Sequence, residues 1–312
     1  MDNYCIAVFK NNDLPGQKSC IKNFFQQILL RFKEMDKTDW FETLEITSEL
    51  IINLIRMPYT MEEYRELNDK KREMVLRDAM EICRAKGVKH CILPFKIQED
   101  IESEGFYKKC FNGKILYRVL LANIINKICY IKDLDINSIE ISIISGNDKA
   151  ELLQIVKLLS SFIKFVTIIT KDMCINKEVE EIFYETGTSI GISGDYSNTL
   201  KRADIIINLG DAEEFKCFIK EKVVVLNYGK AADFYKKVWV INDIKVELPL
   251  NVAFMLDDSL LKLYKVNEIA EILVMHKAGY PIIDEGYRCD LDFIAKVAAI
   301  FDNDGYELEG FE

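Results

Sequence analysis

The sequence predicts an α/β chain of two domains, in which the second is a doubly wound parallel sheet and the first is smaller. Three observations lead to this fold class. The chain has 312 residues, more than one hydrophobic core usually serves. Short β-branched runs alternate with segments of helical periodicity along most of its length. The connections between successive strands are long enough to hold a helix, as parallel strands require.

The first domain, expected over residues 1–131, begins with a strand at 5–9 and an amphipathic helix at 17–32. A second extended region follows at 43–57, although the apolar residues within 51–55 also fit a short helix.

The exit from that region carries a clear helix signal. Thr60 with Glu63 three residues later forms a capping box, which opens a helix to about Ala85, and Gly87 then stops it. A short strand at 90–95 and a helix from 113 to about 130 complete the domain.

The second domain, expected over residues 132–250, follows a polar break at 132–135 and alternates more regularly. We predict strands at 139–144, 165–169, 189–192, 204–208 and 222–226, and helices at 149–162, 177–185, 196–202 and 212–219. This order predicts a doubly wound, Rossmann-like parallel sheet of the nucleotide-binding type. The C-terminal segment, 251–312, is expected to pack back on the body through helices near 267–275 and 290–301, with Asp290 as a cap.

Composition limits the classes of partner. The 51 acidic and 41 basic residues give a formal charge of −10, which disfavours nucleic acid or an anionic membrane surface. No run is apolar enough to span a membrane, and the N-terminal residues lack an export signal, so we expect a cytoplasmic protein. Nine scattered cysteines and two distant histidines predict no metal site. A homo-oligomer or a protein partner stays open.

The turn after the second domain's first strand is where a dinucleotide fold places G-x-G-x-x-G. Here it reads Ser145-Gly146-Asn147-Asp148-Lys149-Ala150, which meets one glycine requirement in either register. The carboxylate of Asp148 is placed to accept the N–H groups that would otherwise bind phosphate. Against this, Lys149 supplies a positive charge and Asn147 tolerates the left-handed backbone of such turns. An ordinary capped turn is the alternative.

Two further loops at the same edge carry candidate cofactor residues. Thr170 and Lys171, after the second strand, fit the 2′-phosphate of NADP better than the ribose of NAD, although Asp172 blurs this preference. Asn208 and Gly210 follow the fourth strand, where ligands of open α/β folds bind. Asp211 with Glu214 also gives a capping-box start to the next helix, so structure alone explains that loop.

Several short motifs resemble the shikimate-dehydrogenase-like superfamily, and within it the branch of long-chain acyl-(acyl carrier protein) reductases. They are the segments 57–60, 85–89 and 112–114, the run from Glu178 to Gly187 leading into 203–208, and the stretch from Tyr287 through 290–294 to Gly305-Tyr306. The resemblance implies two α/β domains around a cleft, a reduced nicotinamide cofactor in the second, and a carbonyl or acyl substrate on the first.

The resemblance makes Tyr59, Asn112 and Lys114 candidate residues of the substrate cleft. Lys96 is the nearest candidate for a cleft lysine, although an ordinary exposed lysine is the alternative. Two departures matter. Glu268 stands where the reductases carry a nucleophilic cysteine, and a shikimate-type lysine and aspartate pair is not recognisable. We therefore assign no catalytic residue.

Two hypotheses follow. The first is an NADP-dependent oxidoreductase that transfers a hydride to an unknown carbonyl or acyl substrate. The second is a non-catalytic binding or assembly protein that keeps the two-domain body but has lost cofactor binding. If Asp148 caps its helix and fills the anion site, the second hypothesis gains. A vacant, amide-lined cradle favours the first.

Overall fold

The computed structural model describes residues 4–10, 40–47, 50–88, 90–94, 111–234, 237–256, 258–279 and 290–312. The expected helix at 17–32, the end of the expected strand at 90–95, and Lys96 lie outside these residues. The chain divides into two compact units, one of residues 1–112 with 248–285 and the other of 113–247 with 286–312. This division differs from the expected boundaries after residues 131 and 250, because each unit is built from two separate stretches of chain.

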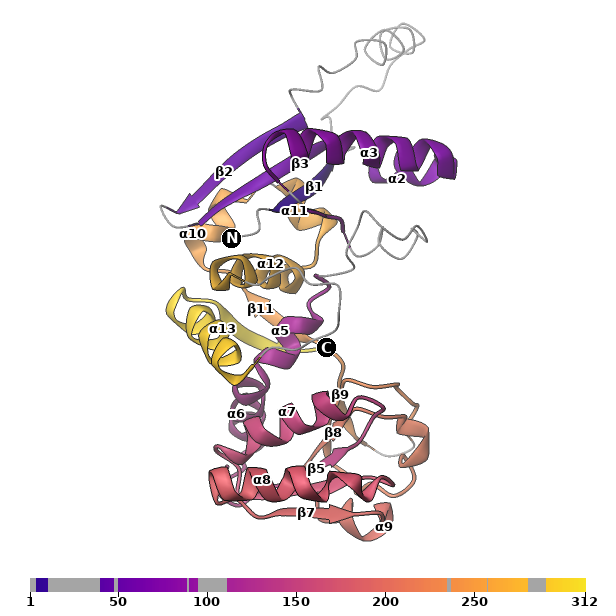
Figure 1. The fold of residues 1–312 in the computed structure, drawn as a ribbon, viewed down its shortest axis with the longest axis vertical. Coiled ribbons are helices and arrows are strands. Elements are labelled where there is room, and N and C mark those ends of the chain that lie inside the picture. The colour runs from indigo at the N-terminus through magenta and orange to yellow at the C-terminus, as the bar shows by residue number, and fades with distance from the viewer. Residues whose placement is uncertain are drawn as a thin grey trace, which may run out of the picture. The chain divides into compact units, whose positions relative to one another are not determined.

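The first unit contains a four-stranded sheet (Figure 1). Its order is β2 (Phe41–Thr47), β3 (Leu50–Thr60), β1 (Tyr4–Lys10) and β4 (His90–Ile92), with β2 antiparallel to β3 and the other pairs parallel. The region 51–55, which the sequence left open between helix and strand, is therefore strand. β2 and β3 form a hairpin, whose pairing brings apolar side chains onto one face.

The capping box at the end of β3 is confirmed. The Thr60 hydroxyl accepts the Glu63 N–H, and the Glu63 carboxylate accepts the Thr60 N–H. The long helix expected from here is two helices, α2 (Met61–Glu66) and α3 (Asp69–Ala85), because Asn68 caps the second one anew. Gly87, with φ of 77°, follows the end of α3 as expected. The apolar stripe of α3 packs in a core with side chains of β1, β3 and β4.

The first unit is completed by α10 (Leu250–Met255), α11 (Asp258–Leu263) and α12 (Val266–Ala278). Between the last two helices, the buried Tyr264 hydroxyl donates to the carbonyl oxygens of Ala7 and Ile92, on β1 and β4. Ten of the thirteen residues of α12 are buried, and the polar residues among them are Asn267, Glu268 and Glu271.

The second unit begins with α5 (Lys114–Val119) and α6 (Leu121–Lys132) and contains a six-stranded, all-parallel sheet. Its strands are β5 (Glu140–Ile144), β6 (Phe165–Ile169), β7 (Ile190–Ser193), β8 (Ile205–Asn208), β9 (Val224–Asn227) and β10 (Trp239–Ile241).

The strands of this sheet lie in the order β7-β6-β5-β8-β9-β10. Counted from β5 as the first, this is 3-2-1-4-5-6, the order of the Rossmann fold, whose topological switch point falls between β5 and β8. The predicted fold class is confirmed: a Rossmann-like domain and a smaller α/β domain.

Two helices, α7 (Lys149–Ser160) and α8 (Asn176–Thr186), lie side by side over the parallel strands (Figure 1). The remaining connections are shorter than expected. α9 covers only Tyr196–Thr199, and the helix expected over 212–219 is a single 3-10 turn, Ala212–Glu214. Sequence analysis missed β10 and an antiparallel pair, β11 (Ile244–Glu247) with β12 (Glu307–Phe311). α13 (Leu291–Asn303) begins as expected at Asp290, which accepts the Phe293 N–H.

Candidate functional site

The carboxyl edge of the parallel sheet, where open α/β folds bind ligands, is the candidate site. The loop between β5 and α7 holds Ser145, Gly146, Asn147 and Asp148 at this edge. The Asp148 carboxylate accepts the N–H of Ala150 at 2.9 Å and that of Glu151 at 3.1 Å. These are amides of the first helical turn, which hold a phosphate in a dinucleotide fold. The chain's own carboxylate takes them instead.

The next three loops along the chain repeat this arrangement. Asp172 after β6 accepts the Cys174 N–H at 2.9 Å, Asp195 after β7 accepts the Ser197 N–H at 2.8 Å, and Asp211 after β8 accepts the Glu213 N–H at 3.0 Å. Aspartate is a favoured cap because it satisfies the free N–H groups of a helical turn. Four consecutive loops at the edge are therefore closed by the chain's own carboxylates.

Hydrogen bonds to these carboxylates favour their charged form. The backbone N–H of Cys174 lowers the pKa of Asp172, and the hydroxyl and N–H of Ser197 lower that of Asp195. The pKa of Asp211 is lowered first by Lys230 and then by the Glu213 N–H. These three carboxylates stay negative at neutral pH, so an approaching phosphate meets like charges.

The lysines of the edge are held by acidic partners. The ammonium nitrogen of each lysine lies close to a carboxylate oxygen: 2.7 Å for Lys149 and Glu178, 2.9 Å for Lys171 and Glu214, and 2.8 Å for Lys230 and Asp211. The pKa of Lys149 is raised, first of all by its hydrogen bond to Glu178. Their positive charges are thus shared with the chain's own acids.

The two residues that favoured NADP are also engaged within the chain. The Thr170 hydroxyl, on a residue only 6% exposed, accepts the Asp172 N–H at 3.1 Å. Lys171 reaches Glu214, whose pKa it lowers and which also accepts the Tyr196 hydroxyl. The sequence had suggested that Glu214 forms a capping box with Asp211. In the structure the Glu214 carboxylate instead pairs with Lys171, from the loop after β6.

At the switch point the glycines are used for contact between loops. A Cβ atom on Gly146 would lie 2.2 Å from the Leu209 carbonyl oxygen, and one on Gly210 would lie 2.7 Å from the Ser145 carbonyl oxygen. A Cβ atom on Gly229, after β9, would lie 2.1 Å from the Gly210 carbonyl oxygen. In a dinucleotide fold the second glycine leaves this kind of space to pyrophosphate. Here the backbone of neighbouring loops occupies it.

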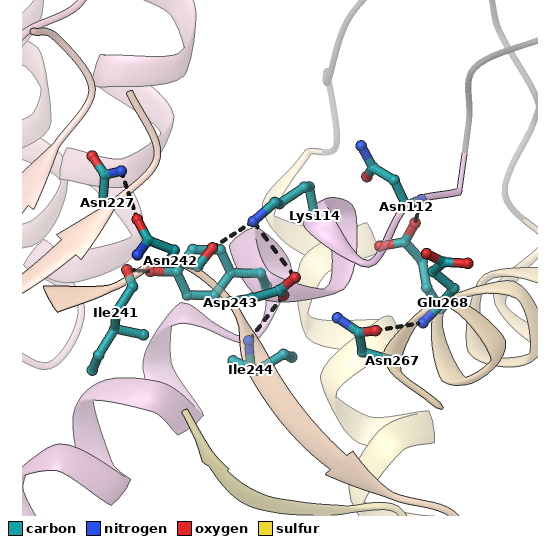
Figure 2. A network of polar contacts seen from close by, with 11 residues as sticks. Asn112, Lys114, Asn227, Ile241, Asn242, Asp243, Ile244, Asn267 and Glu268 are labelled. Atoms are coloured by element: carbon teal, nitrogen blue, oxygen red, sulfur yellow. Dashed lines mark hydrogen bonds and ion pairs between the residues drawn. The ribbon is translucent and has the colours of Figure 1, made fainter. Parts of the chain in front are cut away.

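A chain of side-chain amides crosses the ends of β8, β9 and β10. The side-chain amide of the fully buried Asn208 donates to the side-chain oxygen of Asn227 at 2.7 Å, and its own side-chain oxygen accepts the Gly210 N–H at 3.0 Å. Asn227 in turn donates to the Asn242 side chain at 2.9 Å, a bond drawn in Figure 2. Asn208 and Gly210, which the sequence made candidates for cofactor binding, lie in this network, where Asn208 contacts Gly210, Asn227 and Lys230.

Lys114 lies beside the end of this chain of amides. Its ammonium donates to the Asn242 carbonyl oxygen and lies 3.5 Å from the Asp243 carboxylate (Figure 2). Tyr117, one helical turn later, donates its hydroxyl to the Ile241 carbonyl oxygen at 2.8 Å, and its ring stacks on Tyr228 with centroids 4.4 Å apart. Burial raises the pKa of both tyrosines above the ordinary value, so they stay protonated. Lys114 therefore serves to join α5 to the end of β10.

The other candidate cleft residues lie in the first unit. Tyr59, on β3, is half-buried against the apolar core. The Asn112 N–H donates to the Glu271 carboxylate at 3.1 Å. Glu268, labelled in Figure 2, is 3% exposed in the first turn of α12, and its N–H donates to the Asn267 side chain at 3.0 Å.

These residues do not fit a bound NADP. The N–H groups of Ala150 and Glu151, the three lysines and the Thr170 hydroxyl have partners within the chain, and the Leu209 backbone fills the space beside Gly146. Sequence analysis found the Asp148 cap because a cap is local. Asn227, Asn242 and Gly229 were not identified, because their contacts join distant segments. The aspartate two to four residues after each of β5, β6, β7 and β8 was a signal that the sequence did offer.

Within the ranges that the structure describes, no group of three or more His, Cys, Asp and Glu side chains is arranged to hold a metal ion. In the same part of the chain, no helix is long and apolar enough to cross a membrane. The cytoplasmic location expected from the sequence stays a prediction.

Comparison with known proteins does not identify a family. No protein-family model matches the chain, and no curated protein matches its sequence. Among solved structures, it is similar to the ornithine transcarbamoylase of Giardia lamblia, at 11% identity over 96% of this chain and 85% of that one, with a TM-score of 0.33.

Two dehydrogenase-type structures are similarly distant. A shikimate 5-dehydrogenase-like protein matches at 14% identity over 96% of this chain and 97% of that one, with a TM-score of 0.27. The L-tryptophan dehydrogenase of Nostoc punctiforme matches at 12% identity over 96% and 79%, with a TM-score of 0.30. Such loose likenesses decide neither family nor activity, and the fold class rests on the strand order of the chain itself.

Proposed function

We propose that this chain is a non-catalytic Rossmann-fold protein, which acts by binding or assembling with a partner and does not hold a dinucleotide. The observation that carries the proposal is that the Asp148 carboxylate accepts the N–H groups of Ala150 and Glu151. A phosphate would have to displace this carboxylate and then remain beside its charge.

The rest of the edge supports the same function. Loops at a working site usually leave donors free for the ligand, whereas here donors and acceptors are paired across the loops. The aspartates after β6, β7 and β8 add three more negative charges. Glu268, which stands where the acyl-(acyl carrier protein) reductases have their nucleophile, carries no thiol for an acyl intermediate. We therefore attribute the resemblance to these reductases to common ancestry and not to a shared activity.

The second candidate function is an NADP-dependent oxidoreductase. The strand order favours it, because a 3-2-1-4-5-6 sheet with a switch point between β5 and β8 is the scaffold of dinucleotide enzymes. It requires the Asp148 carboxylate to leave the helix terminus and the loop of Leu209 to move away from Gly146. Fold alone does not supply the chemistry.

Titration of the purified chain with NADPH and with NADH, followed by nucleotide fluorescence, separates the two functions. We expect no binding to the native chain up to about 1 mM nucleotide, which corresponds to a binding free energy weaker than about 4 kcal/mol. The same titration is made with Asp148→Gly. Glycine is tolerated as a helix cap at a cost of a few tenths of a kcal/mol, so this variant is expected to stay folded.

Asp195→Gly is the matched control, because it removes an equivalent cap from the loop after β7, away from the switch point. NADPH binding gained by Asp148→Gly and not by Asp195→Gly would identify Asp148 as the group that excludes phosphate. Micromolar binding of NADPH by the native chain would contradict the proposed function and justify a screen of carbonyl substrates.

A further inference from the structure

A groove of about 710 Å³ lies in the second unit between α7, α8 and the first turn of α13. Each of the two long helices contributes one stripe with helical spacing, from Ala150 to Lys157 on α7 and from Glu178 to Glu185 on α8. The helices are tied together at one end of the stripes by Lys149 with Glu178 and at the other by Lys157 with Glu185. The groove therefore runs for about two turns along both helices.

The groove combines apolar and acidic side chains. Leu153, Ile182 and Leu291, one from each helix, give it an apolar surface. Its lining also holds five carboxylates and one lysine, Lys157. The two glutamates at the ends of the α8 stripe are paired with lysines. Glu181 and Asp292 have no ion pair with any residue that the structure describes. The lining thus keeps an excess of negative charge beside an apolar strip.

An apolar strip bounded by carboxylates is complementary to one kind of helix. A helix about 10 Å wide that lies between two others presents residues at i, i+3, i+4 and i+7 to them. Its apolar stripe would meet Leu153, Ile182 and Leu291, and lysines or arginines beside that stripe would meet Glu181 and Asp292. An acidic helix or a nucleic acid would be repelled.

We propose that this groove binds a basic amphipathic helix of a protein partner. The inference deepens the proposed function, on which it rests, by giving the class of partner that a non-catalytic chain of this kind would bind. The groove is formed by α7, α8 and α13, and it meets the carboxyl edge at one end only, at Ala150 and the ion pair of Lys149 with Glu178.

The test uses a labelled synthetic peptide of about four helical turns, with leucines on one face and lysines on the other. Its binding to the full chain is followed by fluorescence anisotropy. We expect the wild type to bind this peptide, and Glu181→Lys to weaken binding about tenfold or more, since it places a like charge against the peptide. Glu180→Lys is the matched control: it makes the same charge change at the neighbouring, exposed position of α8, outside the groove. We expect it to change binding by about twofold at most.

Two further measurements separate a groove from a diffuse acidic surface. Leu153→Ala should weaken peptide binding several-fold, because it removes part of the apolar strip. A peptide of the same composition but scrambled order should bind much more weakly than the amphipathic one. Equal loss with Glu180→Lys and Glu181→Lys, equal binding of the scrambled peptide, or no binding by the wild type would each overturn the proposal. The NADPH titration is independent, so failure of either proposal is visible without the other.

Discussion

An aspartate placed just after a parallel strand either satisfies the N–H groups of the next helical turn itself or leaves them for a ligand. In this chain the carboxylates accept these N–H groups themselves, at Asp148, Asp172, Asp195 and Asp211. The capping at Asp148 could be predicted because donor and acceptor are only two or three residues apart. The ion pair of Lys149 with Glu178 could not, because its partner comes from another helix. The sequence alone therefore did not decide whether the loop after β5 could bind phosphate. In the structure Asp148 takes the N–H groups of this loop and Glu178 takes the charge of Lys149.

Asp195 offers a pH test of these caps. Its folded pKa lies below the ordinary 3.8, chiefly through the Ser197 hydroxyl and N–H, so its charge stabilises the fold above the unfolded pKa and this contribution is lost as pH falls through the folded pKa. We expect Asp195→Asn to lower the urea midpoint at pH 7, and we expect this difference to shrink at a pH well below 3.8, as the carboxylate becomes protonated in the folded protein. Glu309→Gln, at an exposed strand position, should match the wild type at both pH values. A difference for Asp195→Asn that stays constant with pH would show that its charge does not matter.

The loops after β5, β8 and β9 act as one packed element at the switch point. Gly146 and Gly210 were identified from sequence as parts of a cofactor site, because glycine at these places usually makes room for pyrophosphate. The residues could be predicted, but their use could not, since the occupying groups are the backbones of Leu209 and Ser145, more than sixty residues away from the glycines they meet. A glycine is needed both where two loops pack closely and where a ligand approaches the backbone, so the glycine alone does not distinguish the two.

Gly146→Ala tests this packing. The added methyl group would lie 2.2 Å from the Leu209 carbonyl oxygen, so the two loops must separate. We expect the variant to lose about 2–4 kcal/mol of unfolding free energy, as strained or overpacked sites do. Gly310→Ala is the control, because a Cβ atom there meets nothing within 4 Å, and its effect should stay within about 0.5 kcal/mol. Chemical denaturation measures both. An unchanged stability for Gly146→Ala would mean that the loops separate at little cost.

For the whole molecule, periodicity predicted what is local and missed what depends on distant partners. The strands from β5 to β9 and the helices α7, α8, α12 and α13 appear near their expected positions, because buried parallel strands and amphipathic helices have clear patterns. β11 and β12 were missed, since each is a strand only by pairing with the other across some sixty residues. The unit boundaries depend in the same way on the return of residues 248–285 to the first unit, which no local pattern records.

Tyr264 shows how this return contributes to stability. Its buried hydroxyl donates to the carbonyl oxygens of Ala7 at 2.9 Å and Ile92 at 3.1 Å, linking the C-terminal stretch of the first unit to β1 and β4. Tyr264→Phe keeps the ring and removes this donor, so it should cost about 1–2 kcal/mol of unfolding free energy. Tyr184→Phe is the matched control, because that side chain is 82% exposed and its loss of a hydroxyl should be neutral. Urea denaturation of both variants, followed by far-UV circular dichroism, gives the comparison. Equal midpoints would show that this hydroxyl adds nothing to the stability of the first unit.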